Sequence, residues 1–164
     1  MRAFARSFRY AFRGVQLCLR ERNFRFHAAL SAYMFGYLLI FDWFTLSRGE
    51  WAALILSTAL VLFTEAANTA VEAIVDLVSP DRHPLAAKAK DVGAGAVLIC
   101  SIGAVAVGLA VLWQPEAFRA LAENYKARPL MLLVLAASLT ATGLWVFPDW
   151  GRAAKDKPFT GDKS

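Results

Sequence analysis

Four apolar stretches, each able to reach across a lipid bilayer as a helix, dominate this sequence. They cover residues 26–46, 51–78, 92–113 and 130–147, and a helix rises about 1.5 Å per residue against a hydrocarbon layer of about 30 Å. Hydrophobic residues make up 58% of the 164 residues, which is more than a soluble domain of this size can bury. The sequence therefore predicts an all-α integral membrane protein with four transmembrane helices, and not a soluble enzyme.

The first 20 residues have the pattern of a helix that lies on a membrane surface. A helix over 2–20 gathers arginines on one face and apolar, mostly aromatic side chains on the opposite face. The arginines are Arg2, Arg6, Arg9, Arg13 and Arg20, and the apolar side chains are Phe4, Phe8, Phe12, Val15 and Leu19. Such an amphipathic helix binds in the headgroup plane, although a soluble helix packed on a core has the same pattern.

Basic residues are unevenly distributed among the segments that flank the apolar stretches. The net charge is +5, and most lysines and arginines lie before residue 26, in the 79–91 loop and after residue 147. Only four lie elsewhere, namely Arg48 and three in the segment 114–129, which we interpret as a linker. The positive-inside rule then predicts a multi-pass protein of the inner (cytoplasmic) membrane, with the N-terminus, the 79–91 loop and a polar tail over 148–164 in the cytoplasm. We expect these basic residues to face a membrane surface and not nucleic acid.

Four polar side chains interrupt the second apolar stretch at helical spacing. Glu65, Asn68, Glu72 and Asp76 are three or four residues apart, so a helix places them on one stripe. Counted from Trp51 at the outer interface, Glu65 lies about 21 Å along the axis, within the hydrocarbon, and Glu72 lies about 32 Å along it, near the cytoplasmic boundary. An ionisable group inside the membrane costs about 3 kcal/mol on insertion and indicates a functional site by default.

Carboxylates stacked along one stripe repel each other unless a cation neutralises them. Carboxylate and amide oxygens without nearby thiols suit Mg²⁺ better than zinc. Lys88, Lys90 and Asp91 follow just across the cytoplasmic loop, and an ammonium beside carboxylates and metal suits a polyphosphate. Glu21, where the surface helix meets the first stretch, is a further oxygen ligand. The simpler alternative, that the first two members of the stripe only form hydrogen bonds between helices, stays open.

The stripe and the lysine segment together resemble a family signature. The strings are Glu65-Ala-Ala-Asn68-Thr-Ala-Val-Glu72-Ala-Ile-Val-Asp76 and His83-Pro-Leu-Ala-Ala-Lys88-Ala-Lys90-Asp91, with Glu21-Arg-Asn-Phe-Arg25 upstream. They resemble the bacterial membrane diacylglycerol kinase and undecaprenol kinase family over about residues 9–113. The resemblance implies a homotrimer of small subunits, each with a surface helix and three spans, and active sites shared between neighbouring chains. It makes residues 1–113 the lipid kinase domain and 130–147 an extra transmembrane helix.

The resemblance also implies a reaction and a set of site residues. The γ-phosphoryl group of ATP would pass to the hydroxyl of a membrane lipid alcohol, with Mg²⁺ as the metal. Glu65 would be the general base and Asn68 would orient the reacting groups. The remaining residues would bind the nucleotide and its metal: Glu21 and Glu72 as ligands of Mg²⁺, Lys90 on the phosphates, and His83 and Asp91 along the nucleotide.

Two other classes of function are compatible with acidic residues inside a membrane. A small ion- or proton-coupled transporter also uses intramembrane carboxylates. Its sites favour the membrane midplane, however, whereas this stripe runs towards the cytoplasm and the 51–78 stretch contains no Gly or Pro break. A scaffold held together by polar contacts is the third possibility. Both alternatives predict no ATP consumption, and within the kinase hypothesis the acceptor stays open between diacylglycerol and undecaprenol.

Overall fold

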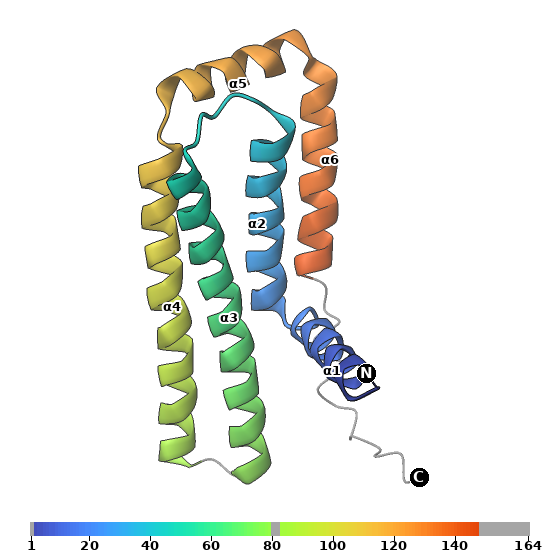
Figure 1. The fold of residues 1–164 in the computed structure, drawn as a ribbon, viewed down its shortest axis with the longest axis vertical. Helices are drawn as coiled ribbons and strands as arrows, with labels where there is room; N and C mark the ends of the chain where they lie inside the picture. The colour runs from blue at the N-terminus through green and yellow to red at the C-terminus, as the bar shows by residue number, and fades with distance from the viewer. Residues whose placement is uncertain (1, 80–82, 148–164) are drawn as a thin grey trace.

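The computed structural model describes residues 2–79 and 83–147, and every regular element in these two ranges is a helix (Figure 1). Two long helices and two shorter ones lie side by side, another helix crosses one end of them, and the N-terminal helix leaves from the other end. The helices are α1 (Arg2–Cys18), α2 (Arg22–Ile40), α3 (Arg48–Val78), α4 (Pro84–Leu112), α5 (Pro115–Ala127) and α6 (Pro129–Val146).

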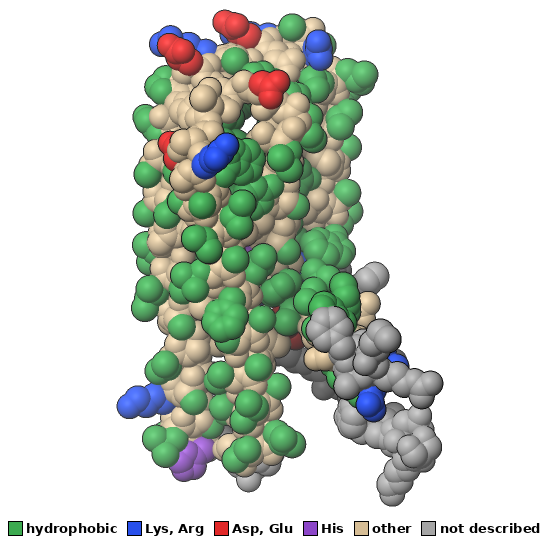
Figure 2. Space-filling model, in the orientation of Figure 1, with side chains coloured by type: hydrophobic (Ala, Val, Ile, Leu, Met, Phe, Trp, Pro, Cys, Tyr) green, Lys and Arg blue, Asp and Glu red, His purple; other side chains and the backbone are tan. Residues whose placement is uncertain are grey.

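The surface of the molecule is that of a membrane protein. Within the described ranges, α3, α4 and α6 are long and apolar enough to cross a membrane. Figure 2 shows apolar side chains along the length of the molecule, with charged side chains mostly towards its two ends. Large apolar side chains such as Leu56, Ile99 and Leu133 stay exposed on these helices, as expected where lipid is the solvent. The predicted all-α membrane fold is confirmed.

The first predicted span, 26–46, has different boundaries from the helix that forms there. α2 begins at Arg22 and ends at Ile40, and residues 41–47 follow as non-helical chain. Because its 19 residues include Arg22 and Arg25, α2 is not among the described helices that meet the hydropathy of a membrane span. The predicted boundaries were wrong at both ends, although α2 does lie alongside α3 and α6 (Figure 1).

Capping residues explain why α3 and α4 begin earlier than predicted. Ser47 and Glu50 form a capping box, in which the Ser47 amide donates to Oε2 of Glu50 over 2.7 Å and the Glu50 amide donates to Oγ of Ser47 over 3.3 Å. α4 begins at Pro84, which suits the first helical position because it needs no amide donor there. The segment carrying Lys88 and Lys90 is therefore helical, and not part of a loop that precedes a span at residue 92.

The segment 114–129, predicted as a linker, is instead largely the helix α5. Pro115 and Glu116 occupy its first turn and Lys126 its last, an order that suits the helix dipole. The side chain of Gln114 fastens its start to the chain between α2 and α3, donating to the Thr45 carbonyl over 3.1 Å and accepting from the Thr45 amide over 3.2 Å. α5 thereby crosses the end of the bundle and leads the chain into α6 (Figure 1).

Three predictions concern the two ends of the chain. The predicted surface helix over 2–20 forms as α1 and ends at Cys18, and Phe12 and Val15 of its apolar face are exposed. The 130–147 stretch forms α6, close to its predicted bounds and apolar enough to cross a membrane. The polar tail predicted over 148–164 lies outside the described residues.

α3 and α4 form an antiparallel pair with the most extensive helix packing in the described part of the chain. Leu54 and Val61 of α3 and Val97 of α4 are buried. At the end where α1 leaves the bundle, the pair extends past the end of α2 (Figure 1). The last turns of α3 and the first turns of α4 therefore stand beyond the level at which α2 begins.

Candidate functional site

The polar stripe on α3 runs from the interior of the molecule to its surface. Glu65 and Asn68 are 4% and 8% exposed, Glu72 is half-buried and Asp76 is exposed. α3 is continuous through all four residues, so their spacing keeps them on neighbouring turns of one face. One helix face thus offers a buried carboxylate at one end and a solvated carboxylate at the other.

The buried carboxylate of Glu65 faces a histidine from α2. Nε2 of His27 lies 3.4 Å from Oε1 of Glu65, and the two side chains are 19% and 5% exposed. A buried carboxylate needs a polar partner, and an imidazole is one that can also hold a proton. This pair was not predicted from the sequence. The only signal in the sequence is that both residues are polar and belong to apolar stretches. His27 lies at the edge of the first stretch, and Glu65 lies within the second.

Asn68 links the buried and half-buried parts of the stripe. Its Nδ2 donates to Oε1 of Glu72, one turn further along α3, over 2.9 Å. Its Oδ1 is buried and accepts no hydrogen bond, and it lies so close to Gly93 of α4 that a Cβ at that position would overlap it. The position of the Asn68 side chain against α4 therefore requires glycine at position 93.

Glu21 lies at the turn between α1 and α2 and completes a group of three acids. It is the N-cap residue of α2, yet its side chain forms no capping hydrogen bond, and it is exposed. The carboxylates of Glu21 and Glu72 are both close enough to Glu65 to repel it. The fold thus brings Glu21, from the turn before α2, near two acids of α3.

Lys90 contacts the outer end of the stripe. Its Nζ donates to Oδ1 of Asp76 over 2.5 Å, and the two side chains are 37% and 67% exposed. We expected Lys90 beside Glu65 and Glu72, but its partner in the structure is the last member of the stripe, one turn beyond Glu72. An ion pair this exposed contributes only about 0–1 kcal/mol, so the ammonium can exchange its carboxylate for another anion.

The other two expected nucleotide-binding residues stand apart from the acids. Nδ1 of His83 accepts the Leu85 amide over 3.2 Å and caps the start of α4. Asp91 follows Lys90 on α4 and is exposed. Among the described residues, neither side chain forms a hydrogen bond or an ion pair with the stripe.

The oxygen atoms at this site fit a hard cation that is bound together with phosphate. The candidate ligands are the carboxylates of Glu21 and Glu72 and the unpaired Oδ1 of Asn68. In residues 2–79 and 83–147, no three acidic, histidine or cysteine side chains gather closely enough to enclose a metal. Mg²⁺ commonly binds through one or two carboxylates, with water and substrate phosphates as its remaining ligands. The residues therefore fit a metal that arrives with a nucleotide better than a permanently bound structural ion.

The part of the chain that contains these site residues is also the part that matches known proteins. Residues 9–112, from α1 to the end of α4, match the prokaryotic diacylglycerol kinase family. An undecaprenol kinase from Bacillus subtilis is 39% identical over 111 residues, which cover 66% of this chain and 86% of the relative. A diacylglycerol kinase from Synechocystis is 41% identical over 111 residues, covering 66% and 62%, and one from Escherichia coli K12 is 45% identical over 60 residues, covering 37% and 49%. The residues matched to the family include all the site residues described above, whereas α5 and α6 lie outside them.

Proposed function

Because the chain belongs to the prokaryotic diacylglycerol kinase family and is a phosphotransferase that acts on a lipid alcohol, we propose that it uses ATP and Mg²⁺ to phosphorylate diacylglycerol or undecaprenol at the cytoplasmic face of the inner membrane. One observation carries this proposal: a single helix face leads from the buried Glu65 to the exposed pair of Asp76 and Lys90. The hydroxyl of the lipid cannot leave the bilayer and ATP cannot enter it. A face that crosses the membrane boundary is where the two can meet.

Glu65 is the proposed general base. Its burial favours contact with a lipid hydroxyl, and His27 on α2 gives its carboxylate a fixed neighbour. Glu65 removes the hydroxyl proton as the oxygen attacks the γ-phosphorus, and the bond from that phosphorus to the bridging oxygen of ADP breaks. A positioned general base contributes about 10²- to 10⁴-fold to a rate.

Glu21 and Glu72 are the proposed ligands of Mg²⁺, which when bound offsets the charge of the phosphate oxygens. Asn68 holds Glu72 by its hydrogen bond and so orients that ligand. Lys90 exchanges Asp76 for the phosphates, and His83 and Asp91 lie along the rest of the nucleotide. Support for this arrangement is the order of the groups along α3 and α4, which runs from the buried base to the exposed ammonium.

The proposed assembly is a homotrimer in which neighbouring copies share active sites. Neighbouring copies would cover part of the apolar surface of α3 and α4, the helices that carry the site, on which large side chains such as Phe63, Leu77 and Val92 are exposed. Within each chain, residues 1–113 are the kinase domain. α6 is an additional span that α5 joins to it.

The test is a phosphoryl-transfer assay on the purified full chain in detergent micelles. Labelled ATP and Mg²⁺ are offered with diacylglycerol and with undecaprenol side by side, and product formation is measured with and without chelator. Wild type is compared with Glu65→Gln and with Glu123→Gln, which makes the same charge change at an exposed residue of α5. Helicity and elution volume confirm that each variant folds.

We expect phosphorylation of at least one of the two lipids, complete dependence on Mg²⁺, and a rate that Glu65→Gln lowers by at least about 100-fold. Glu123→Gln is expected to retain the wild-type rate. His27→Gln is expected to lower the rate less than Glu65→Gln, because His27 only contacts the base. A folded Glu65→Gln protein with more than a tenth of the wild-type rate contradicts the assignment of the base, and no transfer to either lipid contradicts the proposed acceptors.

A further inference from the structure

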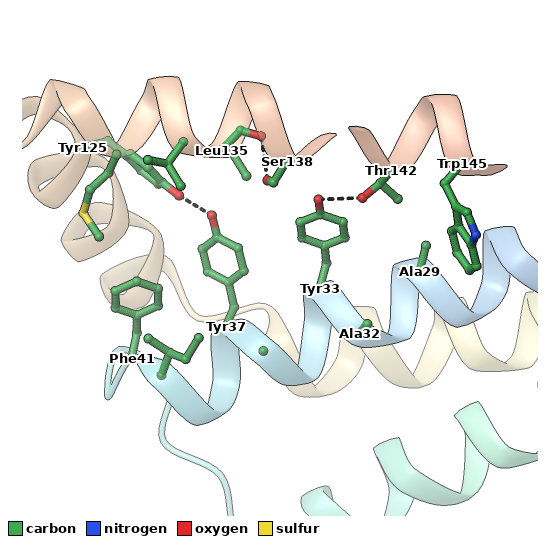
Figure 3. Close-up of a pocket in the computed structure, with 14 residues that line it drawn as sticks. Ala29, Ala32, Tyr33, Tyr37, Phe41, Tyr125, Leu135, Ser138, Thr142 and Trp145 are labelled. Carbon is green, nitrogen blue, oxygen red and sulfur yellow. Dashed lines mark hydrogen bonds between the residues drawn. The ribbon is translucent and has the colours of Figure 1, made fainter. Parts of the chain in front are cut away.

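Polar contacts attach α2 to α5 and α6, two of them shown in Figure 3. The hydroxyls of Tyr37 and Tyr125 hydrogen-bond to each other, and the Tyr33 hydroxyl lies 3.0 Å from Oγ1 of Thr142. At the end of α2 where α1 leaves, the guanidinium of Arg25 donates to the carbonyl of Val146, the last residue of α6, over 3.1 Å. These contacts fix the distance between α2 and α6.

Between these helices lies an open groove with a cavity volume of about 590 Å³, which Phe41 and Tyr125 also line. The space exists because the face of α2 that is turned to α6 carries small residues, Ala29, Ala32 and Gly36, at helical spacing. The opposite wall is mostly apolar and includes Leu135 and Trp145 of α6 (Figure 3). Cavities of about 300–1,000 Å³ with apolar walls and a few polar groups are typical of sites for small ligands.

Arg25 is a buried cation at the Trp145 end of this cavity. It is 5% exposed, it precedes Ala29 by one turn of α2, and its Cζ lies 5.9 Å from the centre of the Trp145 ring. Its guanidinium donates to two carbonyl groups, those of Arg20 and Val146, while its buried Nε has no hydrogen-bond partner. Within the described ranges no carboxylate pairs with it.

Because no carboxylate in residues 2–79 and 83–147 pairs with Arg25, its buried guanidinium favours the approach of a negative charge. The C-terminus of α6 supplies only a partial negative charge. An anion with a long apolar tail suits both the guanidinium of Arg25 and the apolar cavity, because its charged group contacts Arg25 and its tail fills the cavity. In a bilayer, such molecules are the anionic lipids that surround α6.

We propose that the cavity between α2 and α6 binds the chain of one anionic phospholipid, whose phosphate is held at Arg25. This site is separate from the proposed kinase reaction. One of its walls is α6, which lies outside the residues that match the kinase family, and Glu65 and its neighbours on the stripe do not line it. The bound phospholipid acts as a structural ligand that fills the space between the extra helix and the kinase domain.

The test counts the lipids that stay bound to the full chain by native mass spectrometry. The protein is taken from micelles containing equal amounts of phosphatidylglycerol, phosphatidylcholine and diacylglycerol. Gly36→Leu fills the cavity, because an added Cβ at this lining glycine meets nothing within 4 Å. Gly143→Leu is the matched control, since this glycine of α6 is equally open but does not line the cavity. Arg25→Gln removes the charge, and Glu65→Gln changes the proposed catalytic site.

We expect one phosphatidylglycerol per chain, retained at least fivefold over either neutral lipid, in wild type, Gly143→Leu and Glu65→Gln. Gly36→Leu should retain at least fivefold less phosphatidylglycerol, and Arg25→Gln should bind phosphatidylglycerol and phosphatidylcholine equally. The proposal is overturned if Gly36→Leu retains as much as Gly143→Leu, or if wild type holds neutral lipid as well as phosphatidylglycerol. Because Gly36→Leu leaves Arg25 in place, it remains decisive even if Arg25→Gln does not fold.

Discussion

Replacing Gly93 with alanine tests how the two central helices position the proposed metal ligand. A Cβ at this position would overlap Oδ1 of Asn68, so either the two helices move apart or the Asn68 amide rotates. Rotation is the smaller change, because the overlap is with the end of the side chain and the Cβ of Asn68 itself is 4.0 Å away. The rotation removes the 2.9 Å hydrogen bond from Nδ2 to Glu72.

The size of the effect follows from that bond. A hydrogen bond to a charged group contributes about 1.5–3 kcal/mol, and about 1.4 kcal/mol corresponds to a tenfold change. Gly93→Ala should therefore weaken Mg²⁺ activation or lower kcat/KM by about 10- to 150-fold. Residues that orient a metal ligand commonly affect affinity or activity on this scale, about 10- to 100-fold.

The assay is lipid phosphorylation as a function of Mg²⁺ concentration, and Gly95→Ala is the control. A Cβ at Gly95, two residues further along α4, meets nothing within 4 Å, so this variant should behave as wild type. In an Asn68→Ala background the overlap no longer exists, and Gly93→Ala should then add little to the defect. Equal Mg²⁺ dependence of Gly93→Ala and Gly95→Ala, or fully additive effects in the double variant, would refute the reasoning.

Two further predictions concern the ends of the central helices. Lys90→Ala should raise the KM for ATP by about tenfold or more, because a charge-assisted bond to phosphate is lost. Lys88→Ala, a change at the exposed lysine two residues earlier, should leave the KM unchanged. Equal KM values for the two variants in steady-state kinetics would remove Lys90 from the phosphate site. Ser47→Ala breaks the capping box with Glu50 and should destabilise the protein by about 1 kcal/mol without lowering activity. A thermal unfolding midpoint equal to that of wild type would show that other contacts hold the start of α3.

The parts of the fold and site that depend on helical spacing were predictable from the sequence. Three- and four-residue intervals place Glu65, Asn68, Glu72 and Asp76 on one face whatever surrounds them, and the order of burial along that face follows from their distance to the helix end. The resemblance to the kinase family rested on the same intervals. Local patterns of this kind survive folding because they depend on one helix alone.

The contacts between segments were not predictable in the same way. Nothing in the sequence relates His27 to Glu65 or Arg25 to Val146, because these pairs depend on how α2 meets α3 and α6. The helix within the 114–129 linker was not predicted for a related reason. Its polar residues lie on the exposed side of α5 at the end of the bundle, a position that depends on the helices it joins.

The attachment of α6 to α2 makes the part of this chain that matches the kinase family dependent on the helices that follow it, α5 and α6. If the chain stopped after α4, the hydroxyls of Tyr33 and Tyr37 would lose their partners on α5 and α6, and Arg25 would lose the Val146 carbonyl. In hydrocarbon, each polar group stranded in this way costs several kcal/mol. Truncating this protein after α4 would therefore leave polar side chains of α2 without these partners and should destabilise the part of the chain that matches the kinase family.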